Sequence, residues 1–176
     1  GVEPKDRDYL VVGYTRDQMI KAGFTHTATA GGFPVFHHPE TKEEYALART
    51  EVKNGVGYKG FDTLFSPDVT IEEDLSRRDL TINAMAAEIM PDVNGFPAMT
   101  KIYDPFGGQK DIQNKVLRHV NLQADPLRVF RVARFLARFG PEWSVAPETV
   151  KYCQEMPYDE IASISFERVW TEIIKA

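Results

Sequence analysis

The apolar positions predict a strand followed by a helix at the start of the chain. Residues 8–12 (DYLVV) form a short apolar run that is typical of a buried strand. Residues 15–23 (TRDQMIKAG) predict a short helix, with Thr15 as its N-cap, Gln18 completing a capping box and Gly23 as the C-terminal stop. A strand followed directly by a helix indicates an α/β unit.

The next segments predict a β-hairpin and a glycine-rich loop. Residues 33–36 (FPVF) and 43–50 (EEYALART) have strand patterns and flank a polar turn around Pro39. Residues 54–68 (NGVGYKGFDTLFSPD) carry three glycines among aromatic residues, a composition that suits a mobile loop better than a regular element. We therefore expect two paired strands and then a loop.

Helical patterns prevail from residue 70 onwards. Residues 70–73 (TIEE) form a second capping box and predict a helical stretch through residues 77–90 (RRDLTINAMAAEIM), with a break near Arg77. Beyond Val116 the pattern predicts mainly helices, over residues 125–140, 147–156 and 165–176.

A boundary between residues 105 and 115 separates the two kinds of pattern. We expect an α/β (α+β) head with a small mixed sheet over residues 1–112, followed by an all-helical neck over residues 113–176. With 176 residues, 43% hydrophobic and 27% charged, the chain has the composition of a globular protein, which excludes disorder and a fibrous class.

The net charge of -5 excludes a protein whose whole surface binds nucleic acid, so any RNA contact must be local. No apolar run approaches the roughly 18 residues that a membrane-spanning helix needs, and the first residues lack the features of a signal peptide. These two observations predict a cytoplasmic protein without a membrane partner.

Cys153, the only cysteine, excludes an intrachain disulfide and predicts a buried, inert thiol. Because the chain starts at Gly1 and ends within a helical pattern, we expect a fragment of a longer protein.

Two carboxylates precede the first predicted strand. Asp6 and Asp8 are two residues apart, so in a strand their side chains project to the same face. Two such oxygen donors suit Mg²⁺, which prefers carboxylates together with substrate phosphates. In a two-metal site one ion activates the attacking hydroxyl and the other neutralises the leaving pyrophosphate. The alternative is a solvated acidic turn, which is the commoner origin of an isolated pair of this kind.

A second group of polar residues lies in the segment RRDLTINAM. Asp79 and Asn83 are four residues apart, so on a helix they share one face and can present an acceptor and an amide to ribose hydroxyls. Arg77 and Arg78 supply forked donors that suit phosphate oxygens. An ordinary exposed helix face with a polar pair is an equally good interpretation of this segment taken alone.

A third group opens the predicted helix at residue 125. Asp125 and Arg128 are three residues apart and can share a face. Cytosine and adenine each present an exocyclic amine beside a ring-nitrogen acceptor, whereas guanine and uracil carry a carbonyl where the amine would be. One Asp/Arg pair can therefore select C and A without a template strand. The alternative is an N-cap Asp with a weak surface ion pair, worth at most ~0.5 kcal/mol.

In this order, the three groups resemble the class II tRNA nucleotidyltransferases and bacterial poly(A) polymerases of the DNA polymerase beta superfamily. The metal-binding motif resembles KDRDYLVVG, the ribose-recognition motif resembles RRDLTINAMA, and the base-reading helix resembles ADPLRVFRVARF. The hinge between head and neck resembles IYDPFGGQKDIQNKVLRHV, and the helix-stabilising motif of the neck resembles FERVWTE. The resemblance covers nearly the whole chain and implies a nucleotidyltransferase head followed by a helical neck.

The resemblance also implies roles for individual residues. Asp6 and Asp8 would hold the two Mg²⁺ ions and be catalytic. Arg78, Asp79 and Asn83 would contact the phosphates and sugar of the nucleotide. Asp125 and Arg128 would read its base. Arg131 would help to hold the Asp125/Arg128 pair or the triphosphate. The glycine-rich residues 54–66 would form the loop linked to the switch from C to A addition, and Glu51 is a weaker candidate for an auxiliary carboxylate.

Two departures from the family pattern stand out. The family's glycine-rich phosphate-binding segment precedes the metal-binding strand, whereas here nothing precedes Gly1, and Gly31 and Gly32 follow the carboxylates. Ala124 stands where the family usually has an acidic residue before the base-reading Asp, a departure that concerns the stiffness and orientation of Arg128.

Other polar groups have plainer interpretations. His37 and His38 lie beside a proline without partners at metal-ligand spacing, so we interpret them as part of a solvated turn. The arginines of the predicted helix at residue 125 form a stripe that is either a solvated face or a contact for RNA or triphosphate; they are Arg128, Arg131, Arg134 and Arg138.

The leading hypothesis is a template-independent RNA nucleotidyltransferase that adds C and A, or one of them, from CTP and ATP to the 3′ end of tRNA. A bacterial poly(A) polymerase is the nearest alternative, although residues 84–90 (AMAAEIM) lack the aromatic residues that we associate with those enzymes. A nucleotide- or RNA-binding module that has lost catalysis is a third possibility. Retention of Asp6 and Asp8 argues against it, because a pure binder has no need of two such carboxylates.

Overall fold

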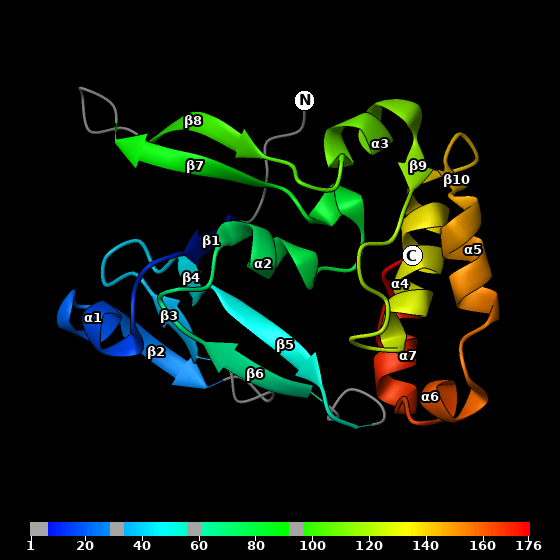
Figure 1. The fold of residues 1–176 in the computed structure, drawn as a ribbon, viewed down its shortest axis with the longest axis horizontal. Coiled ribbons are helices and arrows are strands. Elements are labelled where there is room, and N and C mark those ends of the chain that lie inside the picture. Colours follow the sequence, from blue (N-terminus) through cyan, green and yellow to red (C-terminus); the bar gives the residue numbers. More distant parts are fainter. Residues whose placement is uncertain (1–6, 29–33, 56–60, 92–96) are drawn as a thin grey trace. The chain divides into compact units, whose positions relative to one another are not determined.

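The computed structural model describes residues 7–28, 34–55, 61–91 and 97–176 (Figure 1). The chain forms two compact units, the first from residues 1–50 and 63–74 and the second from residues 51–62 and 75–176. Asp6 and residues 56–60 of the glycine-rich segment lie outside the described residues. The expectations for them therefore stay predictions.

The first unit contains the small mixed sheet that the sequence predicts; it has four strands, including one at residues 25–28 that was not predicted. The strand order is β1-β4-β3-β2, in which β1 and β4 are parallel and the other neighbours are antiparallel. The elements of this part are β1 (Asp8–Val11), α1 (Arg16–Lys21), β2 (Thr25–Ala28), β3 (Pro34–His37) and β4 (Glu44–Leu47).

The predicted start and stop of α1 are confirmed. The Thr15 hydroxyl accepts a hydrogen bond from the Gln18 backbone N–H, and the Gln18 side chain reciprocates, which completes the capping box. Gly23 follows the helix with a φ of +91°, a conformation that glycine adopts without steric cost. The helix packs Met19 against Phe36 and Leu47 of the sheet, and this cluster is the core of the first unit.

Residues 43–50 do not form the single strand that we predicted. The chain leaves the sheet at Ala48, which is buried and donates its N–H to the Val11 carbonyl at 2.9 Å. The following strand, β5 (Arg49–Lys53), pairs with β6 (Phe61–Phe65) instead. The loop predicted over residues 54–68 is wrong at residues 61–65, which form strand β6. The aromatic residues in FDTLF are typical of a strand, but the prediction gave more weight to the neighbouring glycines.

The helical stretch predicted from residue 70 is largely wrong. Its capping box is present, since the Thr70 N–H donates to the Glu73 carboxylate at 2.8 Å, but α2 (Ile71–Ser76) is short. A 3₁₀ turn, η1 (Thr81–Asn83), follows, and then β7 (Ala86–Pro91) pairs antiparallel with β8 (Pro97–Tyr103). Pairing with the next strand along the chain therefore overrides the helical pattern of residues 86–90.

The last part of the chain is helical, as predicted, apart from the two-residue strands β9 (Val116–Leu117) and β10 (Ser144–Val145). Its helices are α3 (Gly108–Asn114), α4 (Leu127–Phe139), α5 (Pro147–Gln154), α6 (Tyr158–Ala162) and α7 (Phe166–Ile174). The core of the second unit is made of Leu80, Leu117, Leu122 and Val132. A functional division at residue 112 stays a prediction.

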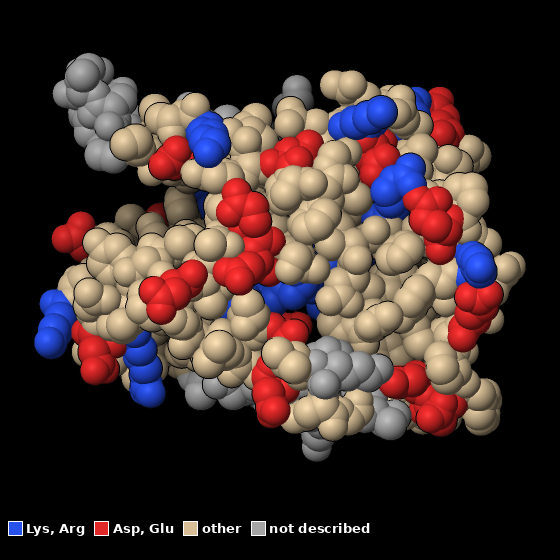
Figure 2. All heavy atoms as spheres, viewed as in Figure 1, with Lys and Arg blue, Asp and Glu red and all other residues tan. Residues whose placement is uncertain are grey.

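Among the described residues, no helix is long and apolar enough to cross a membrane. Positive and negative side chains are interspersed over the face that Figure 2 shows, without a single extended basic patch. This distribution fits the expectation that any RNA contact is local.

The start of α3 depends on Gly108. A Cβ at this position would lie 2.3 Å from the Thr81 carbonyl oxygen and 2.7 Å from the Met85 sulfur. The neighbouring Gly107 has open space around it but a φ of +76°. Only Gly108 is therefore required for the close approach of α3 to η1.

We expect Gly108→Ala to lower the free energy of unfolding by about 3 kcal/mol, because a backbone carbonyl cannot move aside as a side chain can. Gly107→Ala, the matched control, should cost about 1 kcal/mol for placing alanine in the left-handed region. Urea unfolding of both variants checks this. An equal or larger loss for Gly107→Ala would contradict the packing argument.

Candidate functional site

Asp79 is at the centre of the predicted nucleotide site. Its side chain is only 6% exposed. One carboxylate oxygen accepts hydrogen bonds from the Leu80 N–H at 2.9 Å and the Asn83 amide at 3.1 Å, and the other accepts from Arg131 Nε at 2.7 Å. Asp79 and Asn83 therefore meet as the sequence predicts, although across a 3₁₀ turn and not on an α-helical face.

Asp79 remains charged although it is buried. Burial, the largest single influence, raises the pKa of its carboxyl group, but the Arg131 charge and the hydrogen bonds from Asn83, Arg131 and Leu80 together outweigh it and lower the pKa. A lowered pKa means that this group stabilises the fold at neutral pH and loses that contribution as the pH falls through its folded-state pKa.

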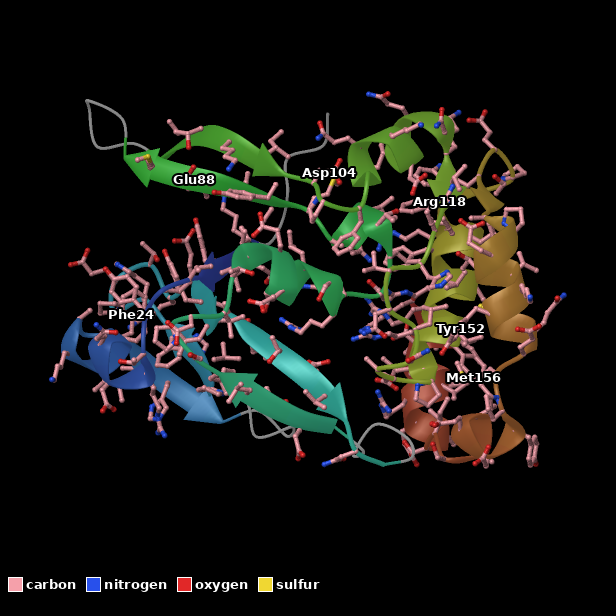
Figure 3. All side chains as sticks on the ribbon, viewed as in Figure 1. Phe24, Glu88, Asp104, Arg118, Tyr152 and Met156 are labelled. Atoms are coloured by element: carbon pink, nitrogen blue, oxygen red, sulfur yellow. The ribbon has the colours of Figure 1, made fainter. Side chains whose placement is uncertain are left out.

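The segment that carries Asp79 is held by an antiparallel backbone pairing. Thr81 donates its N–H to the Arg118 carbonyl at 2.9 Å, Val120 donates to the Asp79 carbonyl at 2.9 Å, and Asn121 donates to the Arg78 carbonyl at 3.1 Å. Beside this pairing, Asp111 of α3 accepts from the Thr81 hydroxyl at 2.8 Å and binds Arg118 at 3.2 Å; Figure 3 labels Arg118. The segment that carries the predicted ribose contacts is therefore held by backbone bonds to residues 118–121 and by a side-chain bond to α3.

Arg128 is fixed by main-chain groups. Its Nη1 donates to the carbonyl oxygens of Arg77 and Asn121, each at 2.6 Å, and its Nη2 lies 3.9 Å from the Glu51 carboxylate. Burial is the main influence lowering the pKa of Arg128, and nearby carboxylates, Asp79 first among them, oppose it. Position 124 is an alanine, so the carbonyls of Arg77 and Asn121, and not an acidic side chain at that position, orient Arg128 here.

Asp125 lies directly before Pro126, the N-cap of α4, and its side chain bonds to the first turn of that helix. Its carboxylate accepts from the Leu127 N–H at 3.0 Å, next to the start of α4. The other carboxylate oxygen binds Arg168 of α7. The weak surface ion pair with Arg128 is not what holds either side chain, since the two have different partners.

The arginine stripe on α4 is mostly an internal network and not a solvated face. Arg134 lies 3.1 Å from the Glu172 carboxylate, which is buried and comes from α7, and Arg131 lies 3.9 Å from it. Arg138 is exposed. The helix α7 thus contributes two charged side chains, Arg168 and Glu172, that the sequence reasoning did not assign individually.

The structure brings Arg78, Asp79, Asn83, Arg128 and Arg131 together in the second unit, with Asp125 at the start of the same helix as the last two. Asp8 is exposed at the start of β1 in the first unit. Glu51 lies 3.4 Å from Arg77, an ion pair within the second unit. Sequence reasoning did not single out Asn121 either, because its backbone bonds to Arg78 and to the Arg128 side chain leave no pattern in the sequence.

The histidines and the cysteine have structural surroundings. The His38 ring nitrogen accepts from the backbone N–H groups of Glu40 and Thr41, which forms the predicted turn, and His37 contacts the Thr27 hydroxyl. The described ranges contain no cluster of three potential metal ligands. Burial raises the pKa of the Cys153 thiol, which favours its unreactive protonated form.

The chain combines a small mixed sheet, a cluster of arginine, aspartate and asparagine side chains, and a series of helices. This combination is that of a nucleotidyltransferase head joined to helices. The chain belongs to the poly A polymerase head domain family, which matches residues 4–118.

The chain is similar to curated proteins along nearly its whole length. It is 54% identical over 176 residues to a multifunctional CCA protein of Actinobacillus pleuropneumoniae serotype 5b, covering 98% of this chain and 40% of that protein. The chain therefore spans about two fifths of the length of the curated relatives that it matches.

Two solved structures have the same fold. A CCA-adding enzyme in its apo form II matches with a TM-score of 0.74 at 22% identity, over 99% of this chain and 41% of that chain. A tRNA nucleotidyltransferase complexed with a primer tRNA and an incoming ATP analog matches with a TM-score of 0.64 at 26% identity, over 99% of this chain and 48% of that chain.

Replacing Arg131 should expose the cost of burying Asp79. We expect Arg131→Gln to lower the free energy of unfolding at pH 7 by about 2 kcal/mol, because a buried carboxylate loses its charged partner, while the partial exposure of Arg131 limits the effect. Without Arg131 the folded-state pKa of Asp79 rises, so the deficit should shrink as the pH falls from 7 towards 4 and the carboxylate becomes protonated.

The matched control is Arg138→Gln, which removes an exposed arginine from the same helix. Urea unfolding at several pH values measures all three proteins. A deficit of Arg131→Gln that is independent of pH would show that Asp79 is not the group it stabilises.

Proposed function

We propose that the protein containing this chain is a template-independent RNA nucleotidyltransferase that adds C and A, or one of them, from CTP and ATP to the 3′ end of tRNA. The relatives named as CCA proteins support this proposal, since they are about half identical to the chain over nearly its whole length. The names of the solved structures, which include CTP, an ATP analog and a primer tRNA, support the same substrates.

The orientation of Arg128 is the observation that carries the proposal. Its guanidinium is always charged, and two carbonyls engage Nη1, so the remaining donors point in fixed directions. A fixed donor suits the ring nitrogen that cytosine and adenine share. Asp125 has acceptor capacity beyond its bonds to Leu127 and Arg168, because an ionised carboxylate accepts at about four positions. That capacity suits the exocyclic amine.

The neighbouring segment would bind the sugar and phosphates. Because the Asn83 amide nitrogen donates to Asp79, its amide oxygen is the group left for a ribose hydroxyl. Asp79, whose three protein contacts orient Asn83 and Arg131, acts mainly as a positioning residue. Arg78 supplies a positive charge for the phosphates, as guanidinium groups commonly do.

Asp6 and Asp8 would hold Mg²⁺. Asp8 is exposed at the start of β1, and its carboxylate oxygen is the donor type that Mg²⁺ prefers. When bound, the ions would activate the attacking hydroxyl and neutralise the leaving pyrophosphate. The poly(A) polymerase alternative uses the same carboxylates, so only the nucleotide incorporated distinguishes the two activities.

Asp8→Ala should abolish nucleotide transfer by the full-length protein while leaving its unfolding free energy within about 0.5 kcal/mol, since an exposed carboxylate contributes little to packing. Asp17→Ala, which removes an exposed carboxylate from α1, is the control and should keep parental activity. The assay supplies each labelled NTP separately to tRNA that lacks its terminus, in the presence of Mg²⁺. Near-normal transfer by Asp8→Ala would refute the metal assignment, and long A-only products would favour poly(A) synthesis.

Arg128→Ala should relax base choice before it removes transfer. A good bidentate contact discriminates by about 1–3 kcal/mol, so the preference for C and A over U and G should fall by roughly 5- to 150-fold. Arg138→Ala is the matched control on the same helix. An unchanged preference in Arg128→Ala would remove the base-reading role from this residue.

A further inference from the structure

The turn between β9 and α4 contains a residue whose contacts all converge on the Arg128 site. The Asn121 side-chain oxygen accepts from the Ala124 N–H at 3.1 Å, which closes the turn over residues 121–124. The backbone of Asn121 makes two further bonds: its N–H donates to the Arg78 carbonyl, and its carbonyl accepts from Arg128. One residue thus contacts the backbone of Arg78, the turn and the Arg128 guanidinium.

This turn is anchored in the core of the second unit. Leu122 is 1% exposed and Ala124 is 4% exposed, so both neighbours of the turn's centre are buried. Gln123, between them, is exposed. Leu122 and Ala124 hold the turn in the core, and the side-chain bond of Asn121 to the Ala124 N–H limits how the Asn121 carbonyl can turn.

The direction of that carbonyl matters because Arg128 Nη1 has two acceptors. The Arg77 and Asn121 carbonyls approach the same nitrogen at 2.6 Å, and the antiparallel pairing places them side by side. Two acceptors on one nitrogen fix the plane of a guanidinium, whereas one acceptor leaves it free to rotate. Fixing this plane sets where Nη2 and Nε direct their hydrogens.

We propose that Asn121 is a positioning residue for nucleotide selection: its side chain closes the 121–124 turn and thereby holds the carbonyl that orients the Arg128 guanidinium. This inference rests on the proposed function, in which Arg128 reads the base. Asn121 acts through Arg128 and touches neither the nucleotide nor the reacting atoms.

Three variants of the full-length protein test the proposal. Asn121→Ala removes the acceptor of the Ala124 N–H, Asn121→Asp keeps an acceptor oxygen at the same place, and Gln123→Ala alters an exposed side chain of the same turn. Single-nucleotide incorporation is measured with each of the four NTPs on tRNA lacking its terminus, together with KM, kcat and thermal unfolding.

Asn121→Ala should lower the preference for C and A over U and G by about 5-fold, which is the effect of losing one ordinary hydrogen bond. The loss should appear mainly as a higher KM for CTP and ATP. Asn121→Asp should retain the parental preference, and so should Gln123→Ala. A general loss of fold would instead lower kcat equally with all four NTPs.

The outcomes separate this inference from the proposed function. If Arg128→Ala loses base preference but Asn121→Ala keeps it, the positioning role of Asn121 is wrong while the base-reading role stands. If Arg128→Ala keeps its preference, or the parent transfers neither C nor A, both proposals fail. If Asn121→Ala does not fold, the other two variants decide. The inference is overturned if Asn121→Asp folds but has a reduced preference for C and A over U and G, while Gln123→Ala keeps the parental preference.

Discussion

The backbone pairing between residues 78–81 and 118–121 is the constraint on which the site depends. It places the Arg77 and Asn121 carbonyls beside the same guanidinium and holds the segment that carries Asp79. Main-chain hydrogen bonds fix the relative positions of these two segments without using side chains. The side chains of this segment are therefore left for charge pairing and for a ligand.

Charge pairing in this region follows from burial. Asp79, Glu172 and Arg128 are all largely removed from water, and an isolated charge in that environment is costly. Each has charged or carbonyl partners from other segments, including α7, which is distant in sequence. Helix α7 thus contributes to this cluster of charged side chains through electrostatics as well as through packing.

Sequence reasoning predicted the features that depend on local chemistry. The capping boxes at Thr15 and Thr70, the mixed sheet and the late helices are present, and Asp79 meets Asn83. It failed where pairing between strands decides. Residues 86–91 have a helical composition but form a strand because residues 97–103, the next strand along the chain, pair with them.

The candidate site could be predicted from the sequence only through its charged side chains. Asn121 was missed since a residue that works through its carbonyl and a turn leaves no characteristic spacing. The contacts of Arg131 and Asp125 with α7 were not predicted for a related reason: spacing along α4 shows which residues share a face, but not which residues of α7 lie opposite.

The position of Leu80 and Leu122 has a consequence for accuracy at different temperatures. Both leucines are fully buried in the same cluster; Leu80 lies within one of the paired segments and Leu122 directly follows the other. Under the proposed function, errors in base choice and loosening of this cluster would therefore be linked: an organism that grows at higher temperature would need a tighter core here to keep the same fidelity, even if its catalytic groups were identical.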